Sequence, residues 1–160
     1  MIAIRAGDRG DFLEAVEVWR RSNEARSNRP VSPDHEKRVL GYLDTENTFL
    51  VVAEDGGHLV GMAIGMQGLE DDGAGPPIQG LCHISMVFVS PERWGEGIGG
   101  QIMDSVLQEA IARGYSKVQL WTHVGNERGQ SLYLSKGFAP SGRQKQDDEG
   151  DAIMHLDRDL

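Results

Sequence analysis

The chain has 160 residues, a formal net charge of −9 at pH 7 and a single cysteine. This length suits one domain with a sizeable core, and one cysteine excludes an internal disulfide framework. The negative charge disfavours nucleic acid and anionic membranes as partners and favours cationic small molecules or peptides, and no apolar run approaches the roughly 20 residues that cross a bilayer. We therefore expect one domain over residues 1–160, and a start without a signal-like pattern predicts a cytoplasmic location.

The first part of the chain predicts a short strand followed by two helices. Residues 2–5 alternate as in a strand, and apolar residues then recur at helical spacing from residue 11 until the pattern fades at residues 22–23. The polar segment 24–31 connects this helix to the next one. A second helix is expected over residues 32–43, because it opens with Ser-Pro, a favoured cap followed by a residue compatible with the first helical position.

The next segment predicts a hairpin and a loop. Two β-rich runs, 49–54 and 59–66, flank Asp55-Gly56-Gly57, which indicates antiparallel strands joined by a tight turn. Residues 68–80 combine acidic residues, four glycines and two prolines, a composition typical of a mobile loop. Two roles are open for this loop: an acidic lip of an acceptor cleft, or a solvated segment without a role.

Residues 83–113 predict a strand, a glycine-rich turn and a helix in succession. One buried stripe of the helix is marked by Ile98, Ile102, Met103, Val106, Ala110 and Ile111. Glycine is costly inside a helix, yet four stand across its first turn: Gly95, Gly97, Gly99 and Gly100. Missing Cβ atoms let a ligand approach the unpaired N–H groups there, and the helix dipole favours an anion such as a phosphate.

Glycine-rich turns also bind ATP and dinucleotides, so the flanking residues decide between these ligands. The nucleoside triphosphatase loop needs Lys followed by Ser or Thr after its last glycine, whereas Gly100 is followed by Gln101 and Ile102. The Rossmann fingerprint places its glycines at the first, third and sixth positions, early in a repeated strand-helix-strand pattern, and the run from Gly95 does not match it.

The last part of the chain predicts a strand and a final hairpin. A helix connects the strands at 83–89 and 117–122, so these two strands should be parallel neighbours. Residues 147–151 predict the turn of the hairpin, with Phe138 opening one strand and residues 152–156 forming the other.

Two motifs carry a resemblance to the GCN5-related N-acetyltransferases, the GNAT family. Trp94-Gly-Glu-Gly97-Ile-Gly99 resembles the family's pyrophosphate loop, which has a Gln or Arg, two residues, a Gly, one residue and a Gly or Ala. Trp94 departs from the pattern at its first position, which makes Arg93 the nearer candidate for a charged phosphate contact. The segment from Asn126 to Phe138 resembles the later motif, an Asn, a short helix carrying a Tyr and a Gly-Phe pair.

The resemblance implies the family's α/β (α+β) fold and its cosubstrate, acetyl-CoA. In this fold a mixed, mostly antiparallel sheet of about six or seven strands carries about four helices. The central parallel pair splays apart, so that the pantetheine arm of coenzyme A bonds to main-chain groups of Val87 and Val89. No metal is expected. The residues expected to bind the cofactor are Val87, Phe88, Val89, Arg93, Trp94, Gly95, Glu96, Gly97, Ile98, Gly99, Gly100 and Asn126.

The resemblance also implies direct acetyl transfer to an amine. Tyr133 stands where many family members carry a tyrosine that faces the sulfur, and it is the candidate general acid; a packed aromatic is the alternative. His83 stands where several relatives carry a catalytic Glu, and with an unperturbed pKa near 6.5 it would take the ammonium proton; a structural histidine is the alternative. Ser85 shares the face of His83 and is a candidate to hold a water. His123 and Glu54 are reserve bases.

The acceptor site of the family borders the first two helices and the loop between them. Candidate substrate contacts are Trp19, Asn23, Glu24, Ser85 and Trp121, with Arg26 and Asn28 in the same segment. An ordinary helix or loop role is the alternative for each. The acceptor is expected to be an amine-bearing small molecule or peptide, and formation of a homodimer is left open.

Two other functions compete with acetyl transfer. A GNAT-like module acting as a sensor or interaction partner would bind coenzyme A without turnover. A nucleotide-binding protein that uses the glycine turn for ATP would be stabilised by Mg-ATP more than by coenzyme A.

Overall fold

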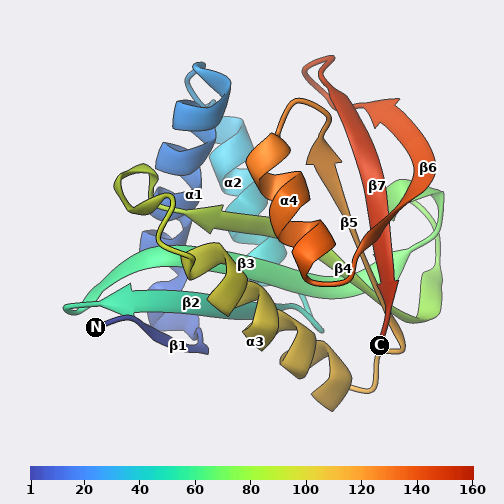
Figure 1. Cartoon of the computed structure of the whole chain (residues 1–160), viewed down its shortest axis with the longest axis horizontal. Helices are drawn as coiled ribbons and strands as arrows, with labels where there is room; N and C mark the ends of the chain where they lie inside the picture. Colours follow the sequence, from blue (N-terminus) through green and yellow to red (C-terminus); the bar gives the residue numbers. More distant parts are fainter. The chain divides into compact units, whose positions relative to one another are not determined.

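The computed structural model describes residues 1–160, which form one seven-stranded sheet and four α-helices (Figure 1). The strand order in the sheet is β1-β2-β3-β4-β5-β7-β6. The strands are β1 (Ala3–Ala6), β2 (Phe49–Asp55), β3 (His58–Leu69), β4 (Pro77–Val89), β5 (Lys117–His123), β6 (Ala139–Gln146) and β7 (Ala152–Asp159). The helices are α1 (Phe12–Ser27), α2 (Pro33–Leu43), α3 (Ile98–Ala112) and α4 (Glu127–Ser135), with short 3₁₀ helices η1 (Arg9–Asp11), η2 (Asp71–Gly73) and η3 (Pro91–Arg93).

The chain divides into two compact units. Unit 1 comprises Met1–Met66 and Met86–Val106, and unit 2 comprises Gln67–Ser85 and Leu107–Leu160. Strand β4 passes from unit 2 into unit 1 after Ser85, and helix α3 passes from unit 1 into unit 2 after Val106. Two continuous elements therefore join the units.

The core of unit 1 lies between the helices α1 and α2 and one face of strands β2 and β3. Its buried members are Ala15, Val16, Val18, Trp19, Val39, Leu43, Leu50, Val52, Leu59, Met62 and Ile64. Helix α3 covers the opposite face, where a Cβ at Gly61 would lie 2.5 Å from Cδ1 of Ile102. Because both faces of β2 and β3 are covered, these strands are continuously apolar rather than alternating.

The turn between β2 and β3 confirms the predicted hairpin. Asp55 pairs with His58, which leaves Gly56 and Gly57 as the two-residue turn. Their φ angles are 61° and 82°, and positive φ at both central positions is what a type I′ hairpin turn requires. Glycine adopts this conformation without the steric cost that other residues incur.

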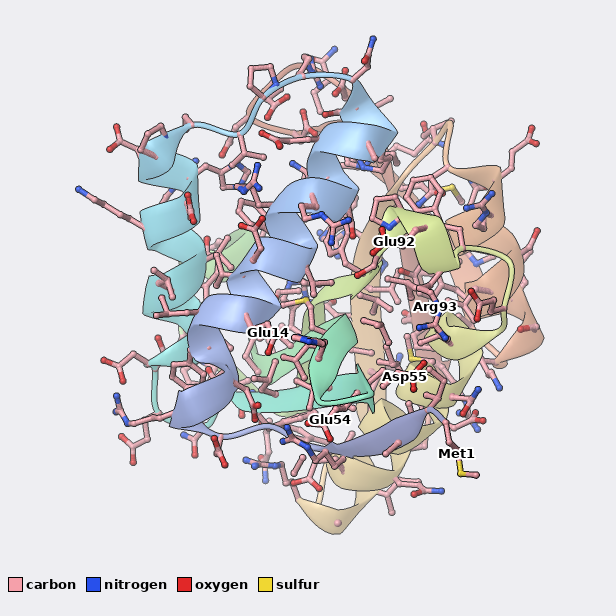
Figure 2. The ribbon with its side chains drawn as sticks, turned by 90° about the vertical axis from the view of Figure 1, so that its left-hand side faces the viewer. Met1, Glu14, Glu54, Asp55, Glu92 and Arg93 are labelled. Atoms are coloured by element: carbon pink, nitrogen blue, oxygen red, sulfur yellow. The ribbon has the colours of Figure 1, made fainter.

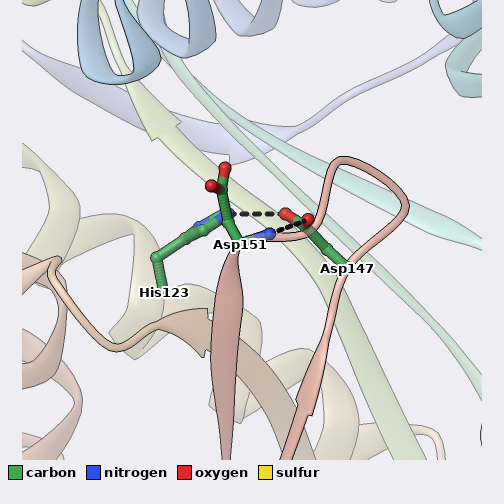
Figure 3. Close-up of side chains that lie close together, drawn as sticks. All are labelled: His123, Asp147 and Asp151. Carbon is green, nitrogen blue, oxygen red and sulfur yellow. Dashed lines mark hydrogen bonds and ion pairs between the residues drawn. The ribbon is translucent and has the colours of Figure 1, made fainter.

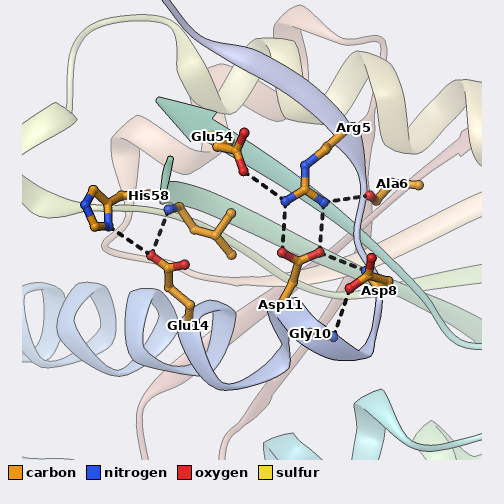
Figure 4. A network of polar contacts seen from close by, with 9 residues as sticks. Arg5, Ala6, Asp8, Gly10, Asp11, Glu14, Glu54 and His58 are labelled. Atoms are coloured by element: carbon orange, nitrogen blue, oxygen red, sulfur yellow. Dashed lines mark hydrogen bonds and ion pairs between the residues drawn. The ribbon is translucent and has the colours of Figure 1, made fainter. Parts of the chain in front are cut away.

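A polar network fastens β1 to the start of α1 (Figure 4). Arg5 donates to both carboxylate oxygens of Asp11, at 2.8 and 2.9 Å, and to Glu54 at 3.0 Å. The hydrogen bonds from Arg5 lower the pKa of the Asp11 carboxyl, because they stabilise its ionised form. Asp8 caps η1 by accepting from the Gly10 N–H at 2.8 Å. The network fixes the point where the strand turns into the helix.

Unit 2 is built on β5, β7 and β6, which are antiparallel, and on the first part of β4. The pairing of β4 with β5 is parallel and joins Leu81–Ile84 to Lys117–Leu120. This confirms the parallel neighbours and, with the seven strands and four helices, the predicted fold class. The predicted splay concerns parts of β4 and β5 that belong to different units, and it stays a prediction. None of the helices has the length and apolar character needed to cross a membrane.

The two faces of the sheet in unit 2 differ in character. Along β5 the side chains alternate between the core and a partly exposed face, as expected for a strand with one buried side. The buried positions are Val118, Leu120 and Thr122, and the partly exposed ones are Gln119, Trp121 and His123. The partly exposed face therefore carries polar and aromatic side chains, among them several of the candidate site residues.

The predicted end of the first helix was wrong. Helix α1 continues to Ser27 instead of fading at residues 22–23. An ion pair between Arg20 and Glu24, at 2.6 Å, supports its last turns, and Ser27 Oγ donates to the carbonyl of Asn23 at 2.8 Å. Asn28 then ends the helix with φ of 56°, a left-handed cap in a segment that was predicted to be loop.

The predicted loop at residues 68–80 is also shorter than expected. Strand β3 continues to Leu69, and β4 begins at Pro77, which is compatible with a strand because it is the first residue. The Gln67 amide donates to the carbonyls of Gly68, Ile78 and Leu81 at 2.9, 2.7 and 3.2 Å. This side chain ties the end of β3 to the start of β4, a contact that composition does not reveal.

Candidate functional site

The glycine-rich turn lies at the start of α3 in unit 1. Gly95 and Gly97 have φ of 85° and 80°, in the left-handed region that strains other residues. The Gln101 N–H donates to the Gly97 carbonyl at 3.3 Å, so the N–H groups of residues 98–100 precede the first helical bond. Ile98 is buried and anchors the first turn. The turn thus presents a row of N–H groups at the positive end of a helix, which suits a phosphate.

Arg93 is held by carboxylates of unit 1 (Figure 2). It donates to Asp55 at 3.0 Å and to the two oxygens of Glu96 at 2.9 and 3.1 Å, and Asp55 also accepts from the α-amino group of Met1 at 2.8 Å. The charge of Arg93 is therefore compensated within the chain. A phosphate would contact this guanidinium only in competition with the two carboxylates, which makes the backbone N–H groups the stronger feature of the turn.

The end of β4 is anchored through the carbonyl oxygen of Val89. It accepts hydrogen bonds from the indole N–H of Trp94 and from the hydroxyl of Ser22, each at 2.7 Å. A carbonyl oxygen has two lone pairs, so a pantetheine arm would find this acceptor already occupied. Trp94, the residue that departs from the family pattern, therefore fastens the glycine turn to the strand. Phe88 packs against the core of unit 1.

The second motif forms α4 in unit 2. Asn126 is its N-cap, because its side-chain oxygen accepts from the Gly129 N–H at 3.1 Å, and its amide nitrogen lies 3.5 Å from Thr122 Oγ1. A Cβ at Gly129 would lie 2.4 Å from the Asn126 amide nitrogen, so a larger residue there would displace the capping side chain. Asn126 thus has a capping role in the fold, and its predicted contact with the cofactor stays a prediction.

Tyr133 lies on α4 and is buried, with 8% of its surface exposed. Its ring meets Phe138 edge to face, with centroids 6.0 Å apart, a favourable aromatic arrangement. No group of the chain hydrogen-bonds to the hydroxyl, and burial alone raises the pKa of Tyr133 to about 12. The side chain therefore carries a proton at all physiological pH values and has an unused donor.

His83 lies on the partly exposed face of unit 2. Its Nδ1 is 3.3 Å from the amide nitrogen of Gln119 in β5. Burial lowers the pKa of His83 to about 4, with smaller electrostatic contributions from His155 and Lys145 in the same direction and from Asp72 in the opposite one. The pKa of His83 therefore lies well below the unperturbed value near 6.5: the imidazole is neutral at physiological pH and is a weaker base than a solvated histidine.

Two further candidates share this face of unit 2. Ser85 Oγ is buried and has no hydrogen-bond partner in the chain, which marks a place for a water or a ligand atom. Trp121 lies beneath two cations, with the Arg143 guanidinium 5.2 Å and Lys145 Nζ 4.5 Å from its ring centroid. Arg143 is in turn paired with Asp72 at 2.7 Å.

The candidate substrate contacts on α1 have contacts within the fold. Trp19 is 2% exposed and belongs to the core of unit 1, so it is not available to a substrate. Glu24 uses both carboxylate oxygens within the chain, accepting from Arg20 at 2.6 Å and from the Val31 N–H at 2.8 Å. It holds the connection between α1 and α2 in place.

The remaining candidates on α1 shape its C-terminal end. The Asn23 side-chain oxygen accepts from Arg26 at 2.8 Å, and Asn28 supplies the left-handed cap. Contact of these residues with a substrate stays a prediction.

The reserve bases are also engaged. Glu54 accepts from Arg5, and His123 Nε2 lies 2.9 Å from Asp147 Oδ2. His123, Asp147 and Asp151 each place one potential ligand atom within 4.8 Å of the other two (Figure 3). They form the one group of three such residues that could hold a cation. The Asp147 carboxylate already accepts the N–H groups of Glu149 and Asp151, at 3.0 and 2.9 Å, so the hairpin turn itself explains its position.

Three residues that the sequence analysis did not single out lie in a hydrogen-bonded series with His83: Gln119, His155 and Ser141. His155 is 4% exposed and stands in the otherwise apolar start of β7. A histidine at a buried strand position needs hydrogen-bond partners for both ring nitrogens. A histidine within an apolar strand pattern could therefore have indicated a buried polar network.

Comparisons with known proteins agree with the two motifs. The model of the Acetyltransferase (GNAT) family matches residues 13–138. N-acetyltransferase 8 of Rattus norvegicus is 33% identical over 106 residues, which cover 66% of this chain and 46% of the relative. N-acetyltransferase 8B of Mus musculus is 33% identical over 102 residues, covering 64% and 42%. The matched region is thus less than half of the length of these curated relatives.

Solved structures share the fold over the whole chain. The ribosomal-protein-S18-alanine N-acetyltransferase from Escherichia coli superposes with a TM-score of 0.78 at 17% identity, over 100% of this chain and 94% of that one. The PaiA N-acetyltransferase from Thermoplasma acidophilum, solved in complex with coenzyme A, gives a TM-score of 0.70 at 17% identity, over 100% and 99%. At these identities the likeness is one of fold.

Proposed function

Because the chain belongs to the GNAT family of acetyltransferases, we propose that it transfers the acetyl group of acetyl-CoA to a primary amine. The transfer is direct, with donor and acceptor bound together. The observation that carries the proposal is the turn before α3, where two glycines with positive φ lead into a helix whose first N–H groups have no intrahelical acceptor. Such a turn recognises a pyrophosphate by its charge and shape, as the nucleotide end of coenzyme A requires.

The proposed chemistry needs no covalent intermediate on the protein. The amine nitrogen attacks the thioester carbonyl, a C–N bond forms, and the C–S bond breaks to release the thiolate. Tyr133 gives its proton to the sulfur as negative charge develops there. Its unpaired hydroxyl supports this role, and a pKa of about 12 keeps the proton on the oxygen at physiological pH.

His83 is proposed to receive the proton that the amine loses, directly or through a water beside the unpaired Ser85 hydroxyl. Its low pKa makes it a poor base toward a free ammonium ion. The nitrogen becomes far more acidic once it has bonded to the carbonyl carbon, and a weak base then suffices. The acceptor must therefore bind as a neutral amine.

The acceptor class is an amine-bearing small molecule or peptide. The net charge of −9 favours one that is cationic overall. One structural neighbour is named for acetylating an alanine of a ribosomal protein, and the curated relatives are named as N-acetyltransferases. A peptide N-terminus therefore belongs in any substrate panel beside polyamines, aminoglycosides and amino acids.

Release of free thiol from acetyl-CoA across this panel tests the proposal. We expect turnover with at least one amine, together with thermal stabilisation by coenzyme A. Stabilisation by coenzyme A without turnover on a broad panel would favour a binding module that acts as a sensor. Stabilisation by Mg-ATP exceeding that by coenzyme A would contradict the assignment of the turn.

A further inference from the structure

A series of hydrogen bonds crosses four strands on one face of unit 2. The Gln119 side-chain amide in β5 lies between two imidazole rings: its Nε2 is 3.3 Å from Nδ1 of His83 in β4, and its Oε1 is 2.8 Å from Nε2 of His155 in β7. Nδ1 of His155 is 2.7 Å from Oγ of Ser141 in β6. His83, Gln119, His155 and Ser141 form what we call the Gln119 array.

The chemistry of the amide fixes the proton on each ring. The amide nitrogen can only donate, so Nδ1 of His83 must be the unprotonated nitrogen and its proton is on Nε2. The amide oxygen can only accept, so Nε2 of His155 carries the proton of that ring. Nδ1 of His155 then accepts from the Ser141 hydroxyl. All three hydrogen bonds point the same way, from Ser141 toward His83.

The array has a second direction that satisfies the same groups. Turning the Gln119 amide by half a turn exchanges its oxygen and nitrogen, so that His83 donates from Nδ1 and His155 accepts at Nε2. His155 then donates from Nδ1 to Ser141, whose hydroxyl has the His155 carbonyl oxygen within 3.5 Å. In this direction Nε2 of His83 is unprotonated and can accept a proton.

The surroundings keep both rings neutral, so the tautomer is what varies. His155 is almost fully buried, and burial lowers its pKa as it does that of His83. The charged side chains that act on His83 are Lys145 of β6 and Asp72 of η2, with opposite signs. Nε2 of His83 makes no hydrogen bond within the chain.

We propose that Gln119 and His155 are positioning residues that set the tautomer of His83, with Ser141 closing the far end of the array. In the direction seen in the structure, His83 presents an N–H at Nε2 and is a hydrogen-bond donor. Reversal of the array converts Nε2 into a proton acceptor. The use of this acceptor in acetyl transfer rests on the proposed function, whereas the coupling of the two tautomers does not.

Nitrogen NMR of the histidine rings tests the coupling directly. In ¹⁵N-labelled wild-type protein at pH 7.5, two-bond ¹H–¹⁵N correlations are expected to place the proton on Nε2 of both His83 and His155. A proton on Nδ1 of His83 together with one on Nε2 of His155 would contradict the array, because a single amide cannot accept from both rings and also donate to one of them.

Substitution of Gln119 gives the sharper result. Gln119→Glu supplies a carboxylate that can only accept, so His83 is expected to carry a proton on Nδ1. Gln144→Glu adds the same charge on the exposed face of β6 and should leave both tautomers as in the wild type. An unchanged Nδ1 of His83 in Gln119→Glu would overturn the proposal.

The kinetic arm compares Gln119→Glu with Gln119→Leu. The leucine variant cannot orient His83, and we expect its kcat to fall roughly 10-fold or more while KM for acetyl-CoA is retained, with partial recovery in the glutamate variant. If Gln119→Leu does not fold, His155→Phe removes the partner that orients the Gln119 amide and keeps an aromatic ring beside Trp121. Wild-type kcat in a folded variant would refute the positioning role.

The two kinds of failure are distinguishable. If no amine is acetylated by the wild-type chain, the proposed function fails, and the NMR measurements still decide the coupling. If acetylation is measured but the tautomer of His83 is the same in Gln119→Glu as in the wild type, only the positioning role of Gln119 fails.

Discussion

Tyr133 combines burial with a hydroxyl that has no partner in the chain. Tyr133→Phe keeps the ring, and therefore the contact with Phe138, and removes a donor that matters only as charge develops on sulfur. Turnover with a responsive amine is expected to fall by roughly 10² to 10⁴, with acetyl-CoA affinity and melting temperature nearly unchanged. Tyr115→Phe, at a tyrosine outside the motif, is the matched control.

Two outcomes would defeat the role of Tyr133. Wild-type turnover in Tyr133→Phe would reduce the residue to packing. A loss of stability as large as the loss of rate would mean that the hydroxyl is structural.

The lowered pKa of His83 should make the protein less stable as the pH falls. Its folded pKa of about 4 lies below that of an unfolded chain, near 6.5, so the unfolded state binds more protons between these values. Stability is therefore expected to fall as the pH drops from about 7.5 to 5, with a contribution from His83 of up to about 2 kcal/mol. Urea unfolding of His83→Asn at both pH values should show a smaller fall than the wild type.

The control for this measurement is His58→Asn, which makes the same substitution at an exposed histidine. His155 acts in the same direction as His83, so the variant should keep part of the slope. Equal slopes in His83→Asn and the wild type would mean that burial does not suppress protonation of His83.

For single residues, the sequence predicted local backbone and capping features correctly, but it did not predict roles that depend on neighbours in the folded structure. The glycine turn and the cap of α2 follow from local sequence, because backbone conformation and capping are local properties. Trp19, Glu24 and the pKa of His83 could not be predicted in this way. Their roles depend on neighbours from distant parts of the chain, such as Val31 for Glu24 and Lys145 for His83.

The start of α3 is an element whose backbone, rather than its side chains, is proposed to bind the cofactor. At Gly97 a Cβ would meet no atom within 4 Å, so a substitution acts through its positive φ and through the space that a phosphate needs. Gly97→Val is expected to weaken coenzyme A binding by at least about 10-fold, because relieving the left-handed strain moves the N–H groups. Isothermal titration with coenzyme A provides the measurement.

The matched control is Gly150→Val, which places the same strain at φ of 85° in the turn before β7. Both variants should lose similar stability, and only Gly97→Val should lose affinity. Equal affinity in a folded Gly97→Val protein would remove the turn from the cofactor site.

Element types were predictable, and several boundaries were not. The hairpin at Gly56-Gly57 and the parallel pair follow from turn chemistry and crossover rules. The extensions of α1 and β4 rest on side-chain bonds, from Arg20 to Glu24 and from Gln67 to carbonyls across the turn. Such bonds depend on the folded structure, so a local sequence pattern does not predict them.

For the whole molecule, the question is how the two units unfold. Strand β4 and helix α3 each extend through both units. Unfolding of either unit would therefore disrupt a strand and a helix that the other unit also contains. We therefore propose that residues 1–160 behave as one domain and expect a single unfolding transition, with equal calorimetric and van't Hoff enthalpies. Two resolved transitions in a calorimetric scan would contradict this expectation.

Helix α3 begins at the glycine turn in unit 1 and ends at Ala112 in unit 2. A ligand that binds only the folded turn stabilises that state by about 2.7 kcal/mol at a concentration of 100 Kd. Any opening that unwinds the whole helix must then also release the ligand. Slower deuterium uptake would consequently spread beyond the turn to the last residues of the helix, and occupancy at one end of α3 could be read from amides at the other.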